Sequence, residues 1–530
     1  MKTNRRIRAL FVLFLLFFLA IVVRLFILQI VQHGFFQERS SEQRTRIINL
    51  SANRGDILDR NGEILATSID TFSVFTQAKG FAWLARKLPR GEADKLKAED
   101  PKNYIMLKEK KRIYPKGRTA AQVIGFVGAD NQGLSGVEIA FDKYLKGKTG
   151  RVVTEGDPEG RELYGAVREI DPSEDGMNVT LTIDKNIQYI AEKEIEEQVR
   201  ASSASSGQLM IMDSKTGEIL ALASKPDFDP NEYVKFDRRL WHPRFLDPYE
   251  PGSTFKLITA AAGLEDKVVT PDSRLKALDR LEIGGKVIEN SHKIAWPGPD
   301  ISVSFMLEQS INTGAAQVGI KLGPEKFYDR IKKFGFGETT GFGLDGESSG
   351  IVRSWQRWYK PDIAMITFGQ SIAVTPMQLI SAVSAFANRG KMVAPYLVKK
   401  IESGDGKFVK VNETEIRGRA VSEQTAAQMK TLMHNVCLYG SGKRAQMKWF
   451  AVGGKTGTAQ KSAPGGRGYL KGHYIASFIG LAPLDNPEII ALVIVDDPKG
   501  NIWGESVCGP VFKRAVEATL RYLNVKPDML

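Results

Sequence analysis

The longest apolar run of the chain lies near its N-terminus. From Ala9 to Val31, only Arg24 and Gln29 are polar. As an α-helix this run would be about 34 Å long, enough to cross a hydrocarbon core of about 30 Å. The pattern therefore predicts one transmembrane helix over residues 9–31. We expect the Arg24 side chain to extend to the outer interface, and pairing with a partner helix is the alternative.

Positive charge is concentrated on one side of this run. Residues 1–8 contain Lys2, Arg5, Arg6 and Arg8 and no acidic residue. By the positive-inside rule, residues 1–8 form a cytoplasmic tail and the rest of the chain is exported. A cleaved signal peptide is the alternative, but the apolar run is long and no Ala-x-Ala-like site follows it.

Residues 32–200 mix short β-rich segments with polar turns. Between Arg54 and Ala66, two short apolar stretches flank Asn61-Gly62, a pair that favours the tight turn of a β-hairpin. The basic run Lys108–Arg112 lies among polar residues and is typical of an exposed loop. We therefore expect a β-rich domain after the apolar helix.

A sharper local pattern ends this region. Val179–Ile183 alternates as a strand does, Asp184 is a typical N-cap, and Lys185–Arg200 has helical spacing. The Ser-, Ala- and Gly-rich stretch Ala201–Gly207 follows. We place a domain boundary between residues 200 and 201.

Residues 201–530 alternate strand-like and helix-like patterns. A hairpin is predicted from Gln208–Met212 and Ile219–Ala223, which flank the turn Lys215-Thr-Gly217. The other predicted elements are helices Phe255–Glu265, Ser371–Ala387, Thr425–Tyr439 and Val511–Leu523, and strands Tyr474–Leu481 and Glu488–Val495. The expected fold class is α/β (α+β), with a sheet and a helical portion.

Composition and charge narrow the class of protein. The 530 residues are 42% hydrophobic and 25% charged, which predicts a globular chain of two or more domains. The net charge of +13 includes five basic and no acidic residues in positions 1–31, while residues 32–200 are neutral overall. Over a third of the excess is thus a membrane-topology signal, and the neutral middle region disfavours a nucleic-acid-binding arm.

The two cysteines exclude a disulfide scaffold. Cys437 lies in a helix-like run and Cys508 near the last predicted helix. We expect each to be packed separately, and a disulfide between them stays open.

The candidate chemistry begins in the segment Glu250-Pro-Gly-Ser-Thr-Phe-Lys256. Ser253 and Lys256 stand three positions apart at the start of an apolar helical run, a spacing that puts both side chains on one face of a helix. A Ser hydroxyl alone is a weak nucleophile, and a Lys kept neutral by burial or by a second cation can remove its proton. The helix N-terminus would also offer N–H groups to an oxyanion.

Each short motif of this kind recurs elsewhere by chance. Further copies are Ser273-Arg-Leu-Lys276, Ser51-Ala-Asn53, and Lys-Thr-Gly starting at Lys148 and Lys215. Only Ser253/Lys256, Ser310-Ile-Asn312 and Lys455-Thr-Gly-Thr458 fall in this order within one domain. That ordered set is the one found in penicillin-binding proteins and serine β-lactamases.

With these motifs, the chain resembles a class B penicillin-binding protein over nearly its whole length. Its transpeptidase-like motifs are Tyr249–Lys256, Thr367–Ser371 with Val374-Thr-Pro376, and Gly453–Thr458. Arg54–Gly62 and Gly133–Asp142 are similar to the family's membrane-proximal pedestal. The resemblance implies a pedestal over residues 32–200 and, over residues 201–530, a transpeptidase domain like that of serine β-lactamases, with a central antiparallel sheet and a helical subdomain.

Three other classes fail on specific residues. A P-loop ending at Gly454-Lys455-Thr456 would need Gly where Trp449 stands. A zinc hydrolase would need clustered ligands, yet the five histidines are scattered and no His-Glu-x-x-His is present. An α/β-hydrolase would need a Gly-x-Ser-x-Gly elbow, which the chain lacks.

The resemblance also implies a role for each motif. Ser253 would attack the carbonyl between the two terminal D-alanines of a peptidoglycan stem peptide, with Lys256 as its base. Ser310 would relay a proton toward the leaving amine, and Asn312 would bond either Lys256 or the substrate amide. Lys455 would lower the pKa of Lys256 and help to hold the substrate carboxylate.

The strand residues after Lys455 would complete the site. Thr456 and Thr458 would offer hydroxyls to the carboxylate, and Gly457 would let an extended peptide lie along the strand. The backbone N–H groups of Ser253 and Thr458 would form the oxyanion hole. An amine of a neighbouring stem peptide would then take the acyl group, and β-lactams would stall at Ser253. No metal or organic cofactor is expected.

The resemblance finally implies a cellular setting. The chain is expected in the inner (cytoplasmic) membrane of a bacterium, with its catalytic domain outside. Because no segment for a glycosyltransferase is evident, a polytopic glycosyltransferase and other division-machinery membrane proteins are the expected partners. The segment Tyr249–Lys256 and the compact length favour the division (FtsI-like) branch. Side-wall elongation, sporulation, a carboxypeptidase or β-lactamase, and a non-catalytic wall sensor or scaffold are the alternatives.

Overall fold

The computed structural model describes residues 2–76, 81–155, 169–463 and 468–529. The chain divides into two compact units, each discontinuous in sequence. One consists of Met1–Asn53 and Gly147–Asp175, and the other of Arg54–Lys146 and Gly176–Leu530.

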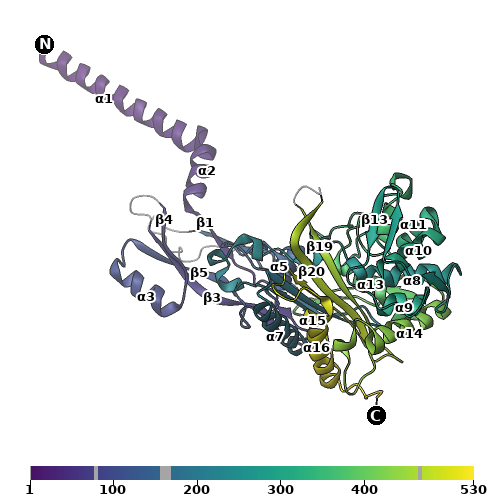
Figure 1. The fold of residues 1–530 in the computed structure, drawn as a ribbon. Helices are drawn as coiled ribbons and strands as arrows, with labels where there is room; N and C mark the ends of the chain where they lie inside the picture. Colours follow the sequence, from purple (N-terminus) through teal and green to yellow (C-terminus); the bar gives the residue numbers. More distant parts are fainter. Residues whose placement is uncertain (1, 77–80, 156–168, 464–467, 530) are drawn as a thin grey trace. The chain divides into compact units, whose positions relative to one another are not determined.

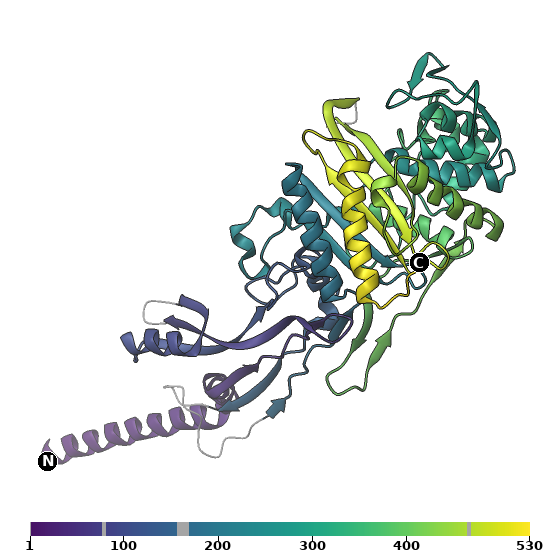
Figure 2. The ribbon, with the colours of Figure 1, turned by 60° about the horizontal axis from the view of Figure 1, so that its bottom comes forward.

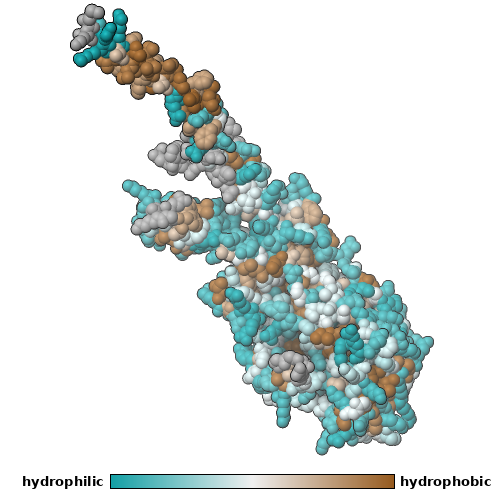
Figure 3. Space-filling model, turned by 90° about the horizontal axis from the view of Figure 1, so that it is seen from above, coloured by the Kyte–Doolittle hydropathy of each residue, from teal (hydrophilic) through white to brown (hydrophobic). Residues whose placement is uncertain are grey.

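The first unit carries the apolar helix. Helix α1 (Lys2–Phe26) continues into one π-helical turn (Ile27–Val31), and the chain bends before α2 (His33–Arg44) (Figure 1). The apolar side chains of α1 are exposed around the helix (Figure 3). In the described part of the chain, this is the helix long and apolar enough to cross a membrane, over Asn4–Val31.

A small antiparallel sheet completes this unit. Its strands are β1 (Thr45–Leu50), β6 (Gly150–Glu155) and β7 (Glu169–Asp171), in the order β1-β6-β7. Strand β1 pairs with β6, about a hundred residues later in the chain. This pairing holds the unit together although the intervening segment belongs to the other unit.

The predicted hairpin opens the second unit. Strands β2 (Ile57–Leu58) and β3 (Ile64–Thr76) flank the turn, in which Gly62 has φ of 86°. Strand β4 (Ala82–Leu88), helix α3 (Arg90–Glu99) and strand β5 (Tyr104–Ile113) follow. Short helices α4 (Ala121–Ile124), α5 (Gly136–Ala140) and α6 (Asp142–Leu145) come next.

The exposed loop predicted for Lys108–Arg112 is wrong. This run lies in β5, which pairs with β3 over ten residues. Arg112 is 5% exposed because a buried carboxylate, that of Glu138, accepts its hydrogen bond at 2.7 Å. A run of basic residues is typical of an exposed loop only when no buried carboxylate elsewhere in the fold binds one of them.

Distant segments share a seven-stranded sheet. Its order is β17-β16-β8-β2-β3-β4, with β5 also paired to β3. The central strand β8 (Asn178–Leu181) confirms the strand predicted at 179–183, and it pairs with β16 (Val398–Glu402), next to β17 (Val409–Val411). The region before residue 200 and the region after it therefore meet in one sheet.

A five-stranded antiparallel sheet forms the centre of the larger unit. Its order is β10-β9-β21-β20-β19, and its strands are β9 (Ser206–Asp213), β10 (Ile219–Lys225), β19 (Gly453–Ser462), β20 (Tyr469–Ala482) and β21 (Ile489–Asp496). The predicted hairpin 208–223 and both predicted C-terminal strands are confirmed. Strand β19 lies at one edge of this sheet.

Helices cover both faces of this sheet. Alternate residues of β9 explain why: Leu209 and Ile211 pack with α7 (Lys185–Ala201) and α16 (Gly509–Tyr522), while Met210 and Met212 pack with the helical portion. Because it is buried on both sides, the central part of β9 from Leu209 to Met212 is apolar at every position. Figure 2 shows α7 and α16 side by side on the outer face. The predicted N-cap Asp184 accepts hydrogen bonds from the first turn of α7.

The helical portion surrounds α8 (Lys256–Glu265), which confirms the helix predicted at 255–265. The other helices are α9 (Val303–Glu308), α10 (Asn312–Leu322), α11 (Pro324–Lys333), α12 (Asp362–Ile366), α13 (Pro376–Ala387) and α14 (Glu423–Tyr439). Paired short strands are β11 (Arg274–Lys276) with β14 (Asp300–Ser302), β12 (Arg280–Ile283) with β13 (Lys286–Glu289), and β15 (Lys391–Val393) with β18 (Ile416–Arg419).

The start of one predicted helix is wrong. Helix α13 begins at Pro376 and not at Ser371, because Thr375 and Gln378 form a capping box and Pro376 stands at the first helical position. Ser371 itself has φ of 59°, which a right-handed helix excludes.

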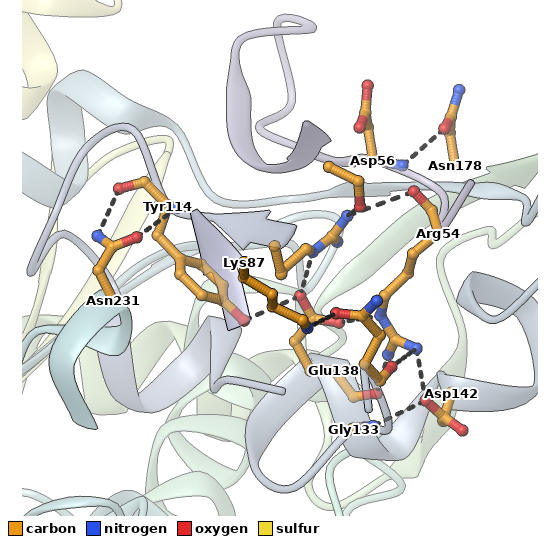
Figure 4. Close-up of polar contacts among 12 residues, drawn as sticks. Arg54, Asp56, Lys87, Tyr114, Gly133, Glu138, Asp142, Asn178 and Asn231 are labelled. Atoms are coloured by element: carbon orange, nitrogen blue, oxygen red, sulfur yellow. Dashed lines mark hydrogen bonds and ion pairs between the residues drawn. The ribbon is translucent and has the colours of Figure 1, made fainter. Parts of the chain in front are cut away.

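A buried ionic cluster lies between the early strands and the short helices of the larger unit (Figure 4). We call it the Arg54 cluster: Arg54, Arg112, Tyr114, Glu138 and Asp142. Glu138 accepts from Arg54 at 2.6 Å and from Arg112 at 2.7 Å, and Asp142 accepts from Arg54 at 2.6 Å. The Tyr114 hydroxyl lies 3.3 Å from Glu138. Each buried charge of this cluster therefore has an opposite charge in contact.

Candidate active site

Ser253 and Lys256 lie on one helical turn, as the spacing predicted. Ser253 is in a 3₁₀ turn (Gly252–Phe255) that runs directly into α8, and Lys256 is the first residue of α8. The Lys256 Nζ lies 3.1 Å from the Ser253 Oγ. The Lys256 side chain is fully buried, whereas Ser253 lines an open hollow. A hydroxyl open to a ligand thus has an amine directly behind it.

Ser310 lies between the two lysines of the site. Its Oγ is 3.2 Å from the Nζ of Lys256 and accepts a hydrogen bond from Lys455 at 3.0 Å. Its carbonyl oxygen lies 2.6 Å from the same Lys256 nitrogen. Ser310 has φ of 56°, a left-handed conformation that is unfavourable for a residue other than glycine. Residues in such strained conformations cluster at functional sites.

Asn312 begins α10 and faces Lys256. Its Oδ1 lies 2.7 Å from the Lys256 Nζ, and its Nδ2 donates to the carbonyl of Glu289 at 2.9 Å. Of the two roles that the sequence left open for Asn312, the geometry favours contact with Lys256.

Lys455 enters the site from β19, the edge strand of the central sheet. Its side chain is fully buried and also lies 3.3 Å from the Oγ1 of Thr456. A Cβ at Gly457 would stand 2.3 Å from the Ser477 Oγ and 3.0 Å from the Thr254 side chain. Glycine is therefore required here because Ser477 of the neighbouring strand β20 and the turn that carries Ser253 both pack against this position.

Both lysines lack an acidic partner within the described residues. Burial, with the nearby positive charge of Lys455, holds the pKa of Lys256 well below its ordinary value. Burial lowers the pKa of Lys455 to about 7. A neutral amine at Lys256 is the form that can accept the proton of Ser253.

The sequence did not identify Ser441 as part of this site. Its Oγ lies 3.0 Å from the Oγ1 of Thr456, which extends the row of hydroxyls beside Lys455. The Oγ1 of Thr458 accepts from the backbone N–H of Gly504 at 3.1 Å. Ser441 lies in a Gly-Ser-Gly segment with no spacing relation to the other motifs, so no local pattern could have revealed it.

Two hollows meet at Ser253. One, of about 490 Å³, is lined by Thr456 and Ser441, and the other, of about 450 Å³, by Asn312 and Gln460. Ser253, Ser291, Thr458 and Trp503 line both. The site can therefore hold ligand on either side of the Ser253 hydroxyl at once.

Cys437 and Cys508 are buried and carry free thiols, and Cys437 lies close enough to Lys455 for each group to affect the pKa of the other. The expectation that each is packed separately holds.

A serine hydroxyl in contact with a buried lysine, beside a Lys-Thr-Gly edge strand, is typical of penicillin-recognising serine enzymes. The model of the penicillin-binding protein transpeptidase domain matches residues 207–517, and that of the penicillin-binding protein dimerisation domain matches residues 76–181. The chain belongs to the class B penicillin-binding proteins and is a serine-type peptidoglycan D,D-transpeptidase.

Individual relatives agree over most of the chain. It is 34% identical to stage V sporulation protein D of Bacillus subtilis, over 98% of this chain and 86% of that protein. It is 28% identical to the peptidoglycan D,D-transpeptidase FtsI of Escherichia coli K12, over 95% and 89%. Penicillin-binding protein 3 of Mycobacterium tuberculosis, in a crystal structure with aztreonam, superimposes with a TM-score of 0.74 at 27% identity, over 91% of this chain and 98% of that one.

Proposed function

We propose that Ser253 is the acylated nucleophile and that neutral Lys256 is its base. The observation that carries this assignment is a buried amine 3.1 Å from the Ser253 hydroxyl with no acidic partner among the described residues. Ser253 attacks the carbonyl between the two terminal D-alanines, and its proton passes to Lys256. Ser310, in contact with both lysines, then carries a proton toward the departing amine.

Lys455 and its neighbours hold the donor. The cation of Lys455 attracts the terminal carboxylate, and the hydroxyls of Thr456 and Thr458 are placed to bond it. The stem peptide adds as a strand along the edge of β19, with the Ser253 and Thr458 N–H groups stabilising the oxyanion. β-Lactams occupy the same position and stay attached to Ser253.

Transfer of the acyl group to an amine of a second stem peptide makes the cross-link. The reaction needs no metal or organic cofactor, because the lysine base and the N–H groups supply the proton transfer and the charge stabilisation. The transpeptidase domain spans residues 201–530 and the pedestal residues 32–200.

The cellular role is cross-linking at the division septum. Residues 9–31 anchor the chain in the cytoplasmic membrane, and residues 1–8, with four positive charges, stay in the cytoplasm. A polytopic glycosyltransferase of the division machinery supplies the glycan strands. FtsI, a relative over 95% of this chain, supports the septal role.

Synthesis during sporulation is the second candidate. It is supported by the 34% identity to stage V sporulation protein D over 98% of the chain. A fluorescent fusion distinguishes the two roles: signal at every division septum supports the first, and signal confined to sporulating cells supports the second. Signal along the side wall would contradict both.

The Ser253→Ala variant tests the nucleophile. It should lose covalent labelling by a fluorescent penicillin while keeping its fold. Ser273→Ala is the matched control, because Ser273 also precedes a lysine by three positions but lies in a polar turn. Labelling of the Ser253→Ala protein at the native level would overturn the assignment.

A further inference from the structure

The first turn of α10, which carries Asn312, has no side-chain cap of its own. The residue before the helix is Ile311, whose apolar side chain cannot accept a hydrogen bond. The first four N–H groups of an α-helix have no partner within the helix, and a nearby polar side chain commonly accepts from one or two of them. The position of Asn312 therefore depends on a group from elsewhere in the chain.

Asn290, the residue directly after β13, supplies that group. Its Oδ1 accepts hydrogen bonds from the backbone N–H of Asn312 at 3.0 Å and from that of Thr313 at 3.2 Å. Its Nδ2 donates to the carbonyl oxygen of Leu278 at 3.0 Å. Because a backbone N–H can only donate, the oxygen of the Asn290 amide has to face the helix. This side chain thus joins the segment that carries β12 and β13 to the start of α10.

The hairpin of β12 and β13 is itself fixed by close packing. Ile288 of β13 is 3% exposed and belongs to one small apolar cluster with Ala316 of α10. At the turn of the hairpin, Gly284 has φ of 56°, and a Cβ there would stand 2.6 Å from the Cβ of Lys360. Asn290 therefore extends from a hairpin that packs both on α10 and on the chain just before α12.

The same hairpin sets the direction of the Asn312 amide. The carbonyl oxygen of Glu289 accepts a hydrogen bond from the Nδ2 of Asn312 at 2.9 Å. With its nitrogen held there, Asn312 turns its Oδ1 to the Nζ of Lys256, at 2.7 Å. Glu289 and Asn290 together fix both the side chain and the backbone of Asn312.

The direction of this amide determines where the lone pair of Lys256 points. A neutral amine has two hydrogens and one lone pair. The two shortest contacts of the Lys256 Nζ are to carbonyl oxygens, that of Ser310 at 2.6 Å and that of the Asn312 side chain at 2.7 Å, and these can only accept. With both hydrogens bonded there, the lone pair is left for the hydroxyls of Ser253 and Ser310, at 3.1 and 3.2 Å. An amine that loses Asn312 can turn an N–H toward Ser253 instead, and it then cannot remove the proton of that hydroxyl.

We propose that Asn290 is a positioning residue for the acylation of Ser253. It acts through Asn312: by capping α10 it keeps both hydrogens of the Lys256 amine bonded and the lone pair free for the nucleophile. This inference rests on the proposed roles of Ser253 and Lys256. No bond to Asn290 forms or breaks in the reaction, so its removal should slow the acylation step and leave the preceding binding step unchanged.

The test separates binding from acylation. The full chain in detergent is mixed with rising concentrations of a fluorescent penicillin, which gives the limiting rate constant of acylation and the concentration at which half of it is reached. The measurement is repeated across pH, and comparing the maxima of the limiting rate constant removes the effect of any change in the pKa of Lys256. We expect Asn290→Ala to lower this maximum about tenfold, the effect of one lost hydrogen bond, with the half-saturating concentration unchanged.

Asn290→Asp is the rescue variant. Its carboxylate still accepts from the two N–H groups of α10 and gives up only the donation to Leu278. That carbonyl oxygen keeps a hydrogen bond from the hydroxyl of Thr313 at 2.8 Å. We expect this variant to regain most of the native maximum.

Asp184→Ala is the matched control for lost stability. Asp184 likewise accepts from two backbone N–H groups at the start of a helix, but that helix is α7, on the outer face of the central sheet. Its midpoint of urea denaturation should fall while its rate constant of acylation stays at the native value.

Four results would each overturn the role of Asn290 alone. They are a native rate constant in Asn290→Ala, a loss confined to the half-saturating concentration, an Asn290→Asp variant as slow as Asn290→Ala, and an equal loss in Asp184→Ala. A native chain that forms no acyl-enzyme, or a Ser253→Ala chain that labels at the native level, would overturn the proposed function and this inference with it.

Discussion

Two buried clusters of charged residues in this chain differ in whether their cations have an acidic partner. In the Arg54 cluster, two arginines meet two carboxylates, and Glu138 bonds both arginines with no exposed surface of its own. In what we call the Ser253 cluster (Ser253, Lys256, Ser310, Asn312 and Lys455), two fully buried lysines meet hydroxyl, amide and carbonyl oxygens. The first cluster is compensated, and the second carries no anion.

The difference separates stability from function. A buried ion is costly unless an opposite charge or strong hydrogen bonds replace its water, so the compensated cluster holds its strands and helices together. The lysines of the Ser253 cluster have only neutral oxygens around them, so their charged forms remain costly. One consequence is a low pKa at Lys256, and a neutral amine is the form of lysine that can act as a base. Removing charge should therefore have opposite effects in the two places.

Lys256→Met should give the largest effect. Loss of a general base typically lowers a rate by about 10²–10⁴-fold, and we expect a fall of this size in the second-order rate constant for acylation by a labelled penicillin. The free energy of unfolding, from urea denaturation followed by circular dichroism, should change little, because removing a buried amine without an acidic partner offsets the loss of its hydrogen bonds to Ser310 and Asn312. Acylation within tenfold of the native rate would contradict the role of Lys256.

Glu138→Ala should give the next largest effect, in stability. Removing the shared carboxylate leaves Arg54 and Arg112 buried without an anion, which typically costs about 3–5 kcal/mol. Asp142→Asn is the control. The Asp142 side chain is partly exposed and binds Arg54 but not Arg112, so the free energy of unfolding should fall by only about 1 kcal/mol. Equal losses in the two variants, by the same denaturation measurement, would show that Glu138 is not the centre of the cluster.

The number of residues that separate two contacting side chains along the chain decides whether the sequence could predict their contact. Ser253 and Lys256 are three residues apart, and Asp184 caps the helix that follows it directly, so both were visible as local patterns. The partners of Glu138 lie 26 and 84 residues away, and its contact with Arg112 buries one side chain of a strand that was expected to be an exposed loop.

The same limit applies inside the active site. Ser441 reaches Thr456 through the packing of α14 against β19, a tertiary contact with no periodic signature. Lys443 and Glu505, which line the hollow with Ser441, come from separate turns and share only that space. The catalytic motifs could be found from the sequence because their order along the chain is known. The residues that line the hollow come together only when the helices and the sheet pack.

The pH dependence of stability is the smallest expected effect. Burial lowers the pKa of Lys455 from 10.5 to about 7, so below about pH 7 both the folded and the unfolded chain hold its proton and the full cost of the buried charge is present. Between about pH 7 and 10.5 the unfolded chain binds more protons, and the free energy of unfolding rises with pH by at most about 1.4 kcal/mol per unit from this group. Lys455→Met lacks this gain, so its stability relative to the native chain should be greatest near pH 7 and decline toward pH 9. Urea denaturation of both proteins across that interval measures the difference, and a constant difference would mean that Lys455 keeps an ordinary pKa.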